Sequence, residues 1–300
     1  MSGLVWLASY PKSGNTWLRI FLTTLLRGED WDLDINNLIG GPIASSRELF
    51  DEMVGYDSAD LTQAEIQRLR PEVYARMARQ ATGGDRPLFC KVHDANLTRD
   101  HQGPPGSFGV ATLYLVRNPL EVAVSYANHS GAEDLDVIIS HMADSDYTLA
   151  GASDRQPNQL RQVLGSWSGH VAGWLDGGHR LLMMRYEDMK HEPEKTFGGA
   201  LDFLGLSFDP GPVKRAIDAC AFERLREQER VRGFREKPMV STAFFRGGET
   251  NSWRGILSEV QVAQIIADHG PMMRRLGYLS EWGEPIDIEK QGGRLWSRSQ

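Results

Sequence analysis

Residues 5–19 contain the feature that constrains the fold most. An apolar run ends at residues 10–11, a short polar loop follows, and helical spacing of apolar side chains resumes from Trp17. This order predicts a buried strand, a tight turn and a helix N-terminus. Backbone N–H groups and the helix dipole point into such a turn, which can therefore hold an anion. Because Gly14 lets the backbone approach a ligand and Lys12 adds a cation, the loop predicts a site for a phosphate-like group.

The rest of the chain predicts how this loop is supported. Four compact apolar runs are typical of buried parallel strands, at residues 4–9, 87–93, 110–116 and 180–186. Helical spacing falls between and after them, at residues 16–26, 61–79, 119–129, 159–174 and 193–204. This alternation predicts an α/β fold, a central parallel sheet flanked by helices. Ligands of such sheets bind beyond the carboxyl ends of the strands.

The bulk composition excludes several classes of protein. With 41% hydrophobic residues the chain can bury a core, which argues against disorder. A net charge of -7 and a pI near 5.7 argue against a nucleic-acid binder, although a local basic pocket can still hold an anion. Two cysteines make neither a disulfide framework nor a metal quartet. The sequence contains neither a visible secretory signal nor an apolar run of membrane-spanning length, so we expect a cytoplasmic protein.

We expect one domain over residues 1–300, because no linker divides the chain. Irregular segments are predicted near residues 28–60, 130–158 and 230–255, which are rich in residues such as Gly, Asp, Asn or Arg. Long loops in a compact domain often serve as lids or binding elements, so these segments are candidates for both roles.

The phosphate loop does not have the NTPase spacing. That loop reads G-x-x-x-x-G-K-[ST], with Lys after the second Gly. Here Lys12 precedes Gly14, and no earlier Gly stands within the loop. A nucleoside-phosphate kinase, which would need ATP and magnesium, is therefore the weaker enzyme hypothesis.

A second phosphate site is indicated at another predicted strand end. Arg117 closes a buried run, and Pro119 opens a helix where its missing N–H costs little. Ser125 follows about two turns into that helix. Arg117 and Ser125 can therefore reach one phosphate, the Arg through a bidentate contact.

Together these motifs resemble those of the sulfotransferase family that uses 3′-phosphoadenosine 5′-phosphosulfate (PAPS). Residues 10–17, Tyr-Pro-Lys-Ser-Gly-Asn-Thr-Trp, resemble the family's 5′-phosphosulfate loop, Y-P-K-[SA]-G-[TN]-T-W. Residues 117–125 resemble its 3′-phosphate motif, R-[ND]-P-x5-S. The resemblance runs from residue 5 to about residue 255 in the family's order of elements, and it is greatest to bacterial natural-product tailoring enzymes.

Residues 91–93, Lys-Val-His, are similar to the family's K-x-H, whose His is the catalytic base. An imidazole suits this role because its pKa lies near working pH. The competing histidines are His101, His129 and His141, but only His93 follows a predicted strand end.

Two downstream segments resemble the family's adenine contacts. Tyr186 belongs to a Y-E-D-M run, whose Tyr approaches the adenine ring in the family. Phe222 takes the Phe position of a T-S-F motif, in which Cys220 replaces the Thr and offers no hydroxyl. Trp17 and Phe222 are expected to sandwich the adenine.

Residues 246–254 resemble the family loop R-K-G-x-x-G-D-W-K over the 3′-phosphate. Arg246, Gly248 and Trp253 match it, whereas Gly247 replaces Lys, Asn251 replaces Gly, Ser252 replaces Asp, and Arg254 replaces the final Lys. One cation is thus lost, and Arg232 and Arg235 are candidates to replace it. The dimer motif of eukaryotic cytosolic members does not follow, so the oligomeric state stays open.

The resemblance implies a PAPS-dependent sulfotransferase (EC 2.8.2 type) that leaves 3′,5′-adenosine bisphosphate (PAP). It implies His93 as the base, Lys12 as the cation beside the leaving oxygen, and Lys91 as support for the transferring group, without a metal. The residues predicted to bind the nucleotide are Lys12, Ser13, Gly14, Asn15, Thr16, Trp17, Arg117, Ser125, Tyr186, Phe222, Arg246, Gly247 and Gly248.

The acceptor is expected to be a small-molecule or natural-product hydroxyl, aromatic or apolar, of the kind found in secondary metabolism. Candidates for its pocket are Trp31, Phe50, Met53, Tyr56, Phe108, Tyr147, Phe244 and Phe245, although core packing explains many of them equally well. A peptide, lipid or sugar acceptor stays open. A non-catalytic nucleotide-binding protein is the third hypothesis, favoured if His93 or Lys12 lies away from the crevice.

Overall fold

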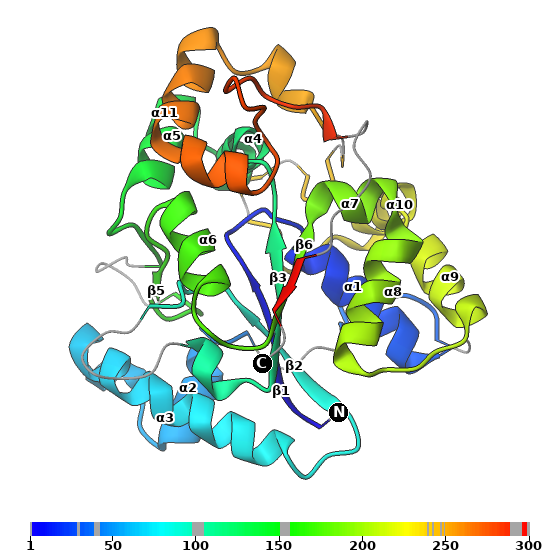
Figure 1. Ribbon diagram of the computed structural model, residues 1–300. Helices are drawn as coiled ribbons and strands as arrows, with labels where there is room; N and C mark the ends of the chain where they lie inside the picture. Colours follow the sequence, from blue (N-terminus) through cyan, green and yellow to red (C-terminus); the bar gives the residue numbers. More distant parts are fainter. Residues whose placement is uncertain are drawn as a thin grey trace.

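A computed structural model (Figure 1) describes residues 2–28, 31–38, 43–97, 105–150, 157–238, 240–241, 243–246, 248, 250–288 and 296–298. Its main sheet contains β1 (Gly3–Ser9), β2 (Pro87–Val92), β3 (Ala111–Val116), β6 (Leu181–Arg185) and β7 (Trp296–Arg298), in the order β2-β1-β3-β6-β7. The first four strands are parallel, whereas β7 runs antiparallel to β6. The predicted α/β fold with a central parallel sheet is thus confirmed, with one antiparallel strand added at its edge.

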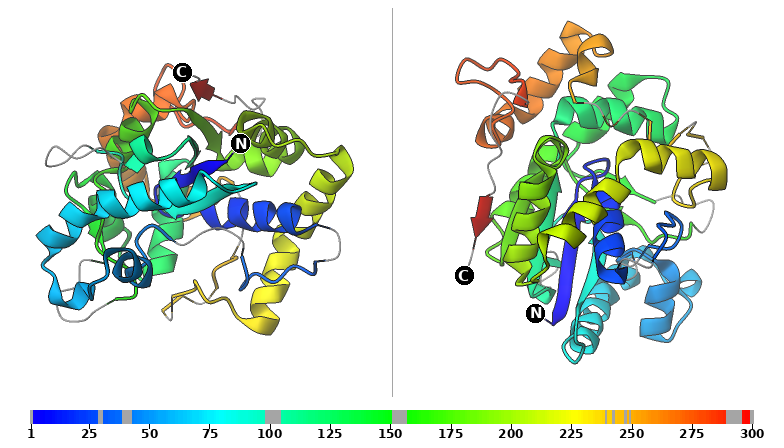
Figure 2. Two further views of the ribbon diagram at one scale, coloured as in Figure 1. Left: turned by 90° about the horizontal axis from the view of Figure 1, so that it is seen from below. Right: turned by 90° about the vertical axis from the view of Figure 1, so that its right-hand side faces the viewer.

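Both faces of the sheet are buried, as the continuous apolar runs predict. Successive side chains of a strand point to opposite faces. Trp6 therefore packs into one core with side chains of α3 and α4, and Leu7 packs into the other with side chains of α1 and α8. Figures 1 and 2 show the sheet between these two groups of helices.

The helices of the first group are α2 (Arg47–Val54), α3 (Gln63–Ala81), α4 (Pro119–Ser130), α5 (Leu135–Ala143), α6 (Trp167–Leu175) and α11 (Glu259–Arg275). The second group contains α1 (Asn15–Arg27), α7 (Tyr186–His191), α8 (Pro193–Leu204), α9 (Pro210–Ala219) and α10 (Phe222–Arg232). Short elements complete the described chain: η1 (Ser58–Asp60), η2 (Pro105–Phe108), η3 (Ser252–Gly255), β4 (Thr148–Leu149) and β5 (Gln162–Val163). No described helix is both long and apolar enough to span a membrane.

One predicted helix is wrong in its first half. Of residues 159–174, only those from Trp167 onward are helical. Gly165 has a φ of 64°, in the left-handed region, and the Ser166 side chain accepts a hydrogen bond from Gly169 N and so caps the helix. The residues before this cap pair with β4 instead, through β5.

Two segments predicted to be irregular are partly helical. Helix α2 lies within residues 28–60, and α5 lies within residues 130–158. Both begin with a polar N-cap, the side chains of Ser46 and Asp134, which accept hydrogen bonds from backbone N–H groups in the first turn.

The parallel strands carry the predicted motifs to one edge of the sheet. After β1 comes the loop at residues 10–17, after β2 comes His93, after β3 comes Arg117, and after β6 comes Tyr186. Because the carboxyl ends of parallel strands lie on the same side, these four segments meet there.

Candidate active site

A cavity of about 990 Å³ lies beyond these strand ends. Its volume is at the upper end of the range usual for small-molecule sites. Of the predicted site residues, those that border it are Lys12, Gly14, Asn15, Thr16, Trp17, Lys91, His93, Arg117, Ser125, Tyr186, Phe222, Arg246 and Gly248. Ser13 does not border it, and Gly247 lies outside the described residues.

The loop at residues 10–17 has a backbone conformation that only certain residues tolerate. Lys12 has a φ of 69° and Gly14 a φ of 98°, both in the left-handed region. A Cβ on Gly14 would lie 2.8 Å from the Tyr186 ring, so both φ and space require glycine. No side chain caps the N-terminus of α1, so its first backbone N–H groups are open to an anion.

Two polar side chains of this loop, those of Asn15 and Ser13, lie buried within it. Asn15 donates from Nδ2 to Leu7 O at 2.8 Å and to Ser9 Oγ at 3.2 Å. Ser13 is fully buried. Ser13 Oγ and Asn15 Oδ1 have no hydrogen-bond partner among the described residues, and Asn15 borders the cavity, so the nucleotide contacts implied by the resemblance stay predictions.

Lys12 is held inside the cavity by neutral groups. Its Nζ lies 3.2 Å from His129 Nδ1 and 4.4 Å from the centre of the Phe244 ring. Burial, and then the charges of Arg117 and Lys91, lower the pKa of Lys12 to about 7. Burial also lowers the pKa of His129, to about 3, so a neutral imidazole accepts the Lys12 hydrogen bond.

The imidazole of His93 is oriented by β1. Its Nδ1 lies 2.7 Å from Ser9 O, and a carbonyl oxygen can only accept, so Nδ1 carries the proton. The lone pair is then on Nε2. Burial, and next the charge of Lys91, lower the pKa of His93 well below its usual value, so the ring is neutral at pH 7.

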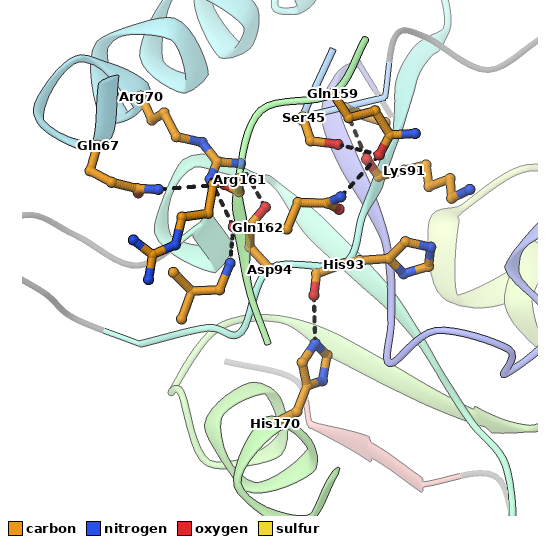
Figure 3. A network of polar contacts seen from close by, with 12 residues as sticks. Ser45, Gln67, Arg70, Lys91, His93, Asp94, Gln159, Arg161, Gln162 and His170 are labelled. Carbon is orange, nitrogen blue, oxygen red and sulfur yellow. Dashed lines mark hydrogen bonds and ion pairs between the residues drawn. The ribbon is translucent and has the colours of Figure 1, made fainter. Parts of the chain in front are cut away.

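The backbone around His93 is fixed by a buried network (Figure 3). His170 donates from Nε2 to His93 O at 3.0 Å, and Tyr114 donates its hydroxyl to His170 Nδ1 at 2.9 Å. Asp94 accepts two hydrogen bonds from Arg70, at 2.8 and 2.6 Å. These contacts hold the end of β2 at one position. The sequence carries no local signal for His170, because it reaches His93 from α6.

Lys91 is paired with a carboxylate that the sequence analysis does not predict. Its Nζ lies 3.3 Å from Glu236, whose other oxygen lies 2.6 Å from Arg19 NH1. Burial opposes ionisation of Glu236, but Lys91 and Arg19 outweigh it and lower the pKa of Glu236 to about 2. In this structure Lys91 therefore belongs to an ion-pair network at the cavity wall.

Arg117 is buried and held from three sides. It pairs with Glu121 at 3.1 Å, lies 4.2 Å from the centre of the Tyr186 ring, and donates to Lys12 O at 3.4 Å. Ser125 lies one turn after Glu121 on α4 and also borders the cavity.

Two of the departures at residues 246–254, Asn251 and Ser252, have structural explanations. Asn251 replaces a Gly and has a φ of 66°, which Asn tolerates better than most residues, and its Nδ2 donates to Asp287 at 2.9 Å. Ser252 replaces an Asp and donates its hydroxyl to Glu121 at 2.9 Å, where an Asp would bring a second carboxylate. Glu121 also pairs with Arg117. It therefore connects Arg117 to the segment at residues 246–254, and both belong to the predicted 3′-phosphate site.

The cations on this side of the cavity differ in part from the prediction. Arg246 is exposed and borders the cavity, and Arg226 donates from NH2 to its carbonyl oxygen at 2.9 Å. Arg226 was not predicted, although it lies one turn after Phe222 on α10. Arg235 borders the cavity, but Arg232 does not and instead lies 3.9 Å from Asp32.

Aromatic side chains, among them Trp17, Tyr186 and Phe222, also border the cavity. The Trp17 ring lies 5.8 Å from that of Tyr186, and its Nε1 donates to Cys220 O at 3.0 Å. Cys220 thus contributes its backbone where its side chain lacks a hydroxyl. Gly248 has a φ of 62°, and a Cβ there would lie 2.6 Å from Phe222, so glycine is required beside that ring.

Most aromatic candidates for the acceptor pocket are wrong. Only Phe244 and Phe245 border the cavity; those that do not are Trp31, Phe50, Met53, Tyr56, Phe108 and Tyr147. Phe50, for example, is buried in the core beside the sheet, and Tyr56 is 70% exposed. Residues that the sequence analysis missed take their place at the wall: Ile43, Tyr126, Leu149, Gln159 and Gln162.

The competing histidines differ in position. His129 borders the cavity beside Lys12, whereas His141 stacks on Tyr147 at 4.4 Å and does not border it. His101 lies outside the described residues. Because His93 and Lys12 border the same cavity, the condition that would favour a non-catalytic binder is absent.

Comparison with known proteins agrees with this geometry. The family model of the sulfotransferase domain matches residues 109–277. The chain belongs to the sulfotransferase family. It is 23% identical over 273 residues to flavonol 3-sulfotransferase of Flaveria bidentis, covering 87% of this chain and 78% of that protein. It is 27% identical over 283 residues to cytosolic sulfotransferase 15 of Arabidopsis thaliana, covering 87% and 69%.

Solved sulfotransferase structures have the same fold. Mouse sulfotransferase SULT7A1, crystallised with PAP, aligns with a TM-score of 0.57 and 18% identity over 94% of this chain and 87% of that chain. Retinol dehydratase in complex with androsterone and PAP aligns with a TM-score of 0.57 and 16% identity, over 90% and 80%. The enzyme class predicted from the motifs, a PAPS-dependent sulfotransferase, is confirmed, and the kinase hypothesis is wrong.

Proposed function

We propose that this sulfotransferase transfers the sulfuryl group of PAPS to a hydroxyl of a small molecule, with His93 as general base. The observation that carries the proposal is the tautomer of His93. Its Nδ1–H is committed to Ser9 O, so the Nε2 lone pair is the one left for an acceptor proton. The acceptor oxygen forms a bond to sulfur, the bond from sulfur to the bridging oxygen breaks, and the acceptor proton moves to Nε2. A sulfate ester and PAP leave.

The 5′ side of the donor fits the loop that precedes α1. Open backbone N–H groups at the N-terminus of α1 and the Thr16 hydroxyl hold the 5′-phosphate. Lys12 stabilises the charge that develops on the bridging oxygen, and fixed charge of this kind is usually the largest catalytic contribution. An anionic donor favours the ammonium form of Lys12 and so offsets the lowering of its pKa by burial.

The 3′-phosphate fits a second part of the cavity, which Arg117, Ser125 and Arg246 border. Glu121 keeps Arg117 in place, and Arg226 supplies a cation where the family Lys is missing at residue 247. Trp17 and Phe222 also border the cavity and bind the adenine between aromatic faces.

The acceptor fits the part of the cavity beside His93. Apolar side chains at that wall, including Ile43, Leu149 and Phe244, suit an aromatic or apolar natural product with a hydroxyl group. Relatives named as flavonol sulfotransferases support this class of acceptor. We further propose that residues 1–300 act as one sulfotransferase domain in the cytoplasm, as the names of the cytosolic relatives suggest.

The variant His93→Ala tests the base. Turnover with labelled PAPS and a hydroxylated aromatic acceptor should fall about 1,000-fold, within the range known for loss of a general base. Binding of PAP, measured by calorimetry, should change less than about twofold, because Lys12 and Arg117 are untouched. His191→Ala, on an exposed histidine at the end of α7, is the matched control. Wild-type turnover in His93→Ala would remove His93 from the mechanism.

The acceptor itself can be found without a prior guess. Labelled PAPS and the enzyme are added to extracts of the source organism, and the labelled product is identified by mass spectrometry. A labelled peptide, lipid or sugar would contradict the small aromatic acceptor and leave the role of His93 intact.

A further inference from the structure

Two side-chain amides border the cavity near His93, and the donor site does not use them. Gln159 and Gln162 both lie in the segment between β4 and α6. Figure 3 shows them near the end of β2, with Lys91 and His93. Backbone hydrogen bonds hold this segment in place, since Leu160 N donates to Ser45 O at 2.7 Å.

The orientation of both amides follows from their partners. Gln159 Oε1 accepts from Ser45 Oγ at 3.1 Å and from Gln162 Nε2 at 2.9 Å. A carbonyl oxygen has two lone pairs, and both are used here. The Gln159 amide is therefore fixed with its oxygen toward Ser45 and Gln162 and its NH₂ group on the other side.

These contacts leave one donor group and one acceptor without partners. Within the described part of the chain, neither Gln159 Nε2 nor Gln162 Oε1 makes a hydrogen bond. Gln162 as a whole is only 3% exposed, and it borders the cavity. Both groups belong to residues of the cavity wall, so a ligand that displaces water from the cavity must pair with them or leave them unpaired, which is costly.

We propose that Gln159 and Gln162 form a subsite for a second hydroxyl group of the acceptor. This inference rests on the proposed function and names its substrate class: an aromatic acceptor with at least two hydroxyl groups. A hydroxyl can accept from Gln159 Nε2 and donate to Gln162 Oε1 at the same time, which a hydrocarbon edge cannot do. The apolar side chains of Ile43 and Leu149, which also border the cavity, suit the ring that carries it.

The test uses the complex of the full chain with PAP and four naphthalene probes. These are 2-naphthol and the dihydroxynaphthalenes with a second hydroxyl at position 3, 6 or 7. Calorimetry should show that at least one diol binds about tenfold more tightly than 2-naphthol. In Gln159→Met and Gln162→Met that preference should fall below about twofold, while 2-naphthol binds as before.

The control is Gln67→Met. Gln67 donates to Arg161 O in the same network, shown in Figure 3, but does not border the cavity. Its variant should keep the preference for the diol.

Several outcomes would overturn the subsite. They are equal binding of all four probes to the wild-type chain, no binding of any probe, or a preference that survives in both variants. The comparison of the four probes on the wild-type chain needs no variant. It can therefore contradict the proposal even if a variant fails to fold. PAP binding and the turnover of His93→Ala report separately on the proposed function.

Discussion

The loop at residues 10–17 and the segment at residues 246–254 border the same cavity, but they are built differently. The loop lies directly between a central strand and α1, and two of its residues have left-handed backbone conformations in a tightly packed turn. Among the described residues, the later segment is preceded by α10 and not by a strand of the sheet. It also contains left-handed residues, Gly248 and Asn251, and it contacts α4 through hydrogen bonds from Ser252 and Trp253 N to Glu121.

This difference explains where the sequence keeps to the family pattern. At residue 14 any side chain would clash with Tyr186, so substitution there changes the loop itself. At residue 252 a different side chain changes one hydrogen bond to Glu121, and a Ser serves that partner. Gly248 in the later segment is constrained like Gly14, because it combines a positive φ with a Cβ clash against Phe222. At residue 251 the φ is positive as well, and Asn replaces the family Gly. A positive φ with a clash therefore requires Gly, whereas a positive φ alone, or a contact to a partner side chain, allows substitution.

Arg117→Ala should have the largest effect, because Arg117 belongs to both regions through Lys12 O and Glu121. Affinity for PAP should fall about 100-fold, since a buried charged contact to the 3′-phosphate is lost. Affinity for adenosine 5′-phosphosulfate, which lacks that phosphate, should fall less than about threefold. Calorimetry with both ligands measures this, with a thermal melt to check folding. Equal losses for both nucleotides would place Arg117 outside the 3′ site.

The affinity for PAP, measured over a range of pH, tests the role of Lys12 in the loop at residues 10–17. Burial lowers the pKa of Lys12 to about 7, and an anionic nucleotide binds the protonated form better. Affinity should therefore be constant below about pH 6 and fall as the pH rises through 7. Between pH 7 and pH 8.5 the Kd for PAP should rise by up to about 15-fold. Lys12→Arg, which stays charged, should remove this dependence. A flat profile in the wild-type chain would contradict the lowered pKa.

Arg226→Ala should have the smallest effect, since this cation is exposed at the edge of the later segment. Loss of one exposed charge should weaken PAP binding about fivefold, and the effect should shrink at high salt. The matched control is Arg224→Ala, an exposed arginine of the same helix that does not border the cavity. If both variants bind PAP alike, Arg226 does not replace the missing lysine.

The local part of the fold could be predicted from the sequence. Helix α8 begins and ends where predicted. No end of a parallel strand differs from its predicted position by more than one residue. Both predictions succeed because the hydrophobic pattern and the Pro and Gly signals are local. Strand β7 was not predicted, since three residues carry little pattern and their partner β6 is far away in the chain. Helices α9, α10 and α11 were also missed, although Pro210 and Ser258 are ordinary start signals.

The candidate site was predictable where function depends on a short motif. Lys12, His93 and Arg117 stand at strand ends, so one pattern supplies both their identity and their position. Glu236 and His170 could not be found in this way. Each reaches the site from a distant element, and its role depends on tertiary packing that no local spacing encodes.

Strand β7, the red arrow in Figure 1, covers the edge of β6 that faces away from β3. It pairs with β6, whose sequence Leu-Leu-Met-Met-Arg would otherwise form an apolar open edge. Such an edge is a template for pairing with another chain, and a very short final strand offers a poor template. A chain shortened before Trp296 should therefore lose solubility before it loses its active site.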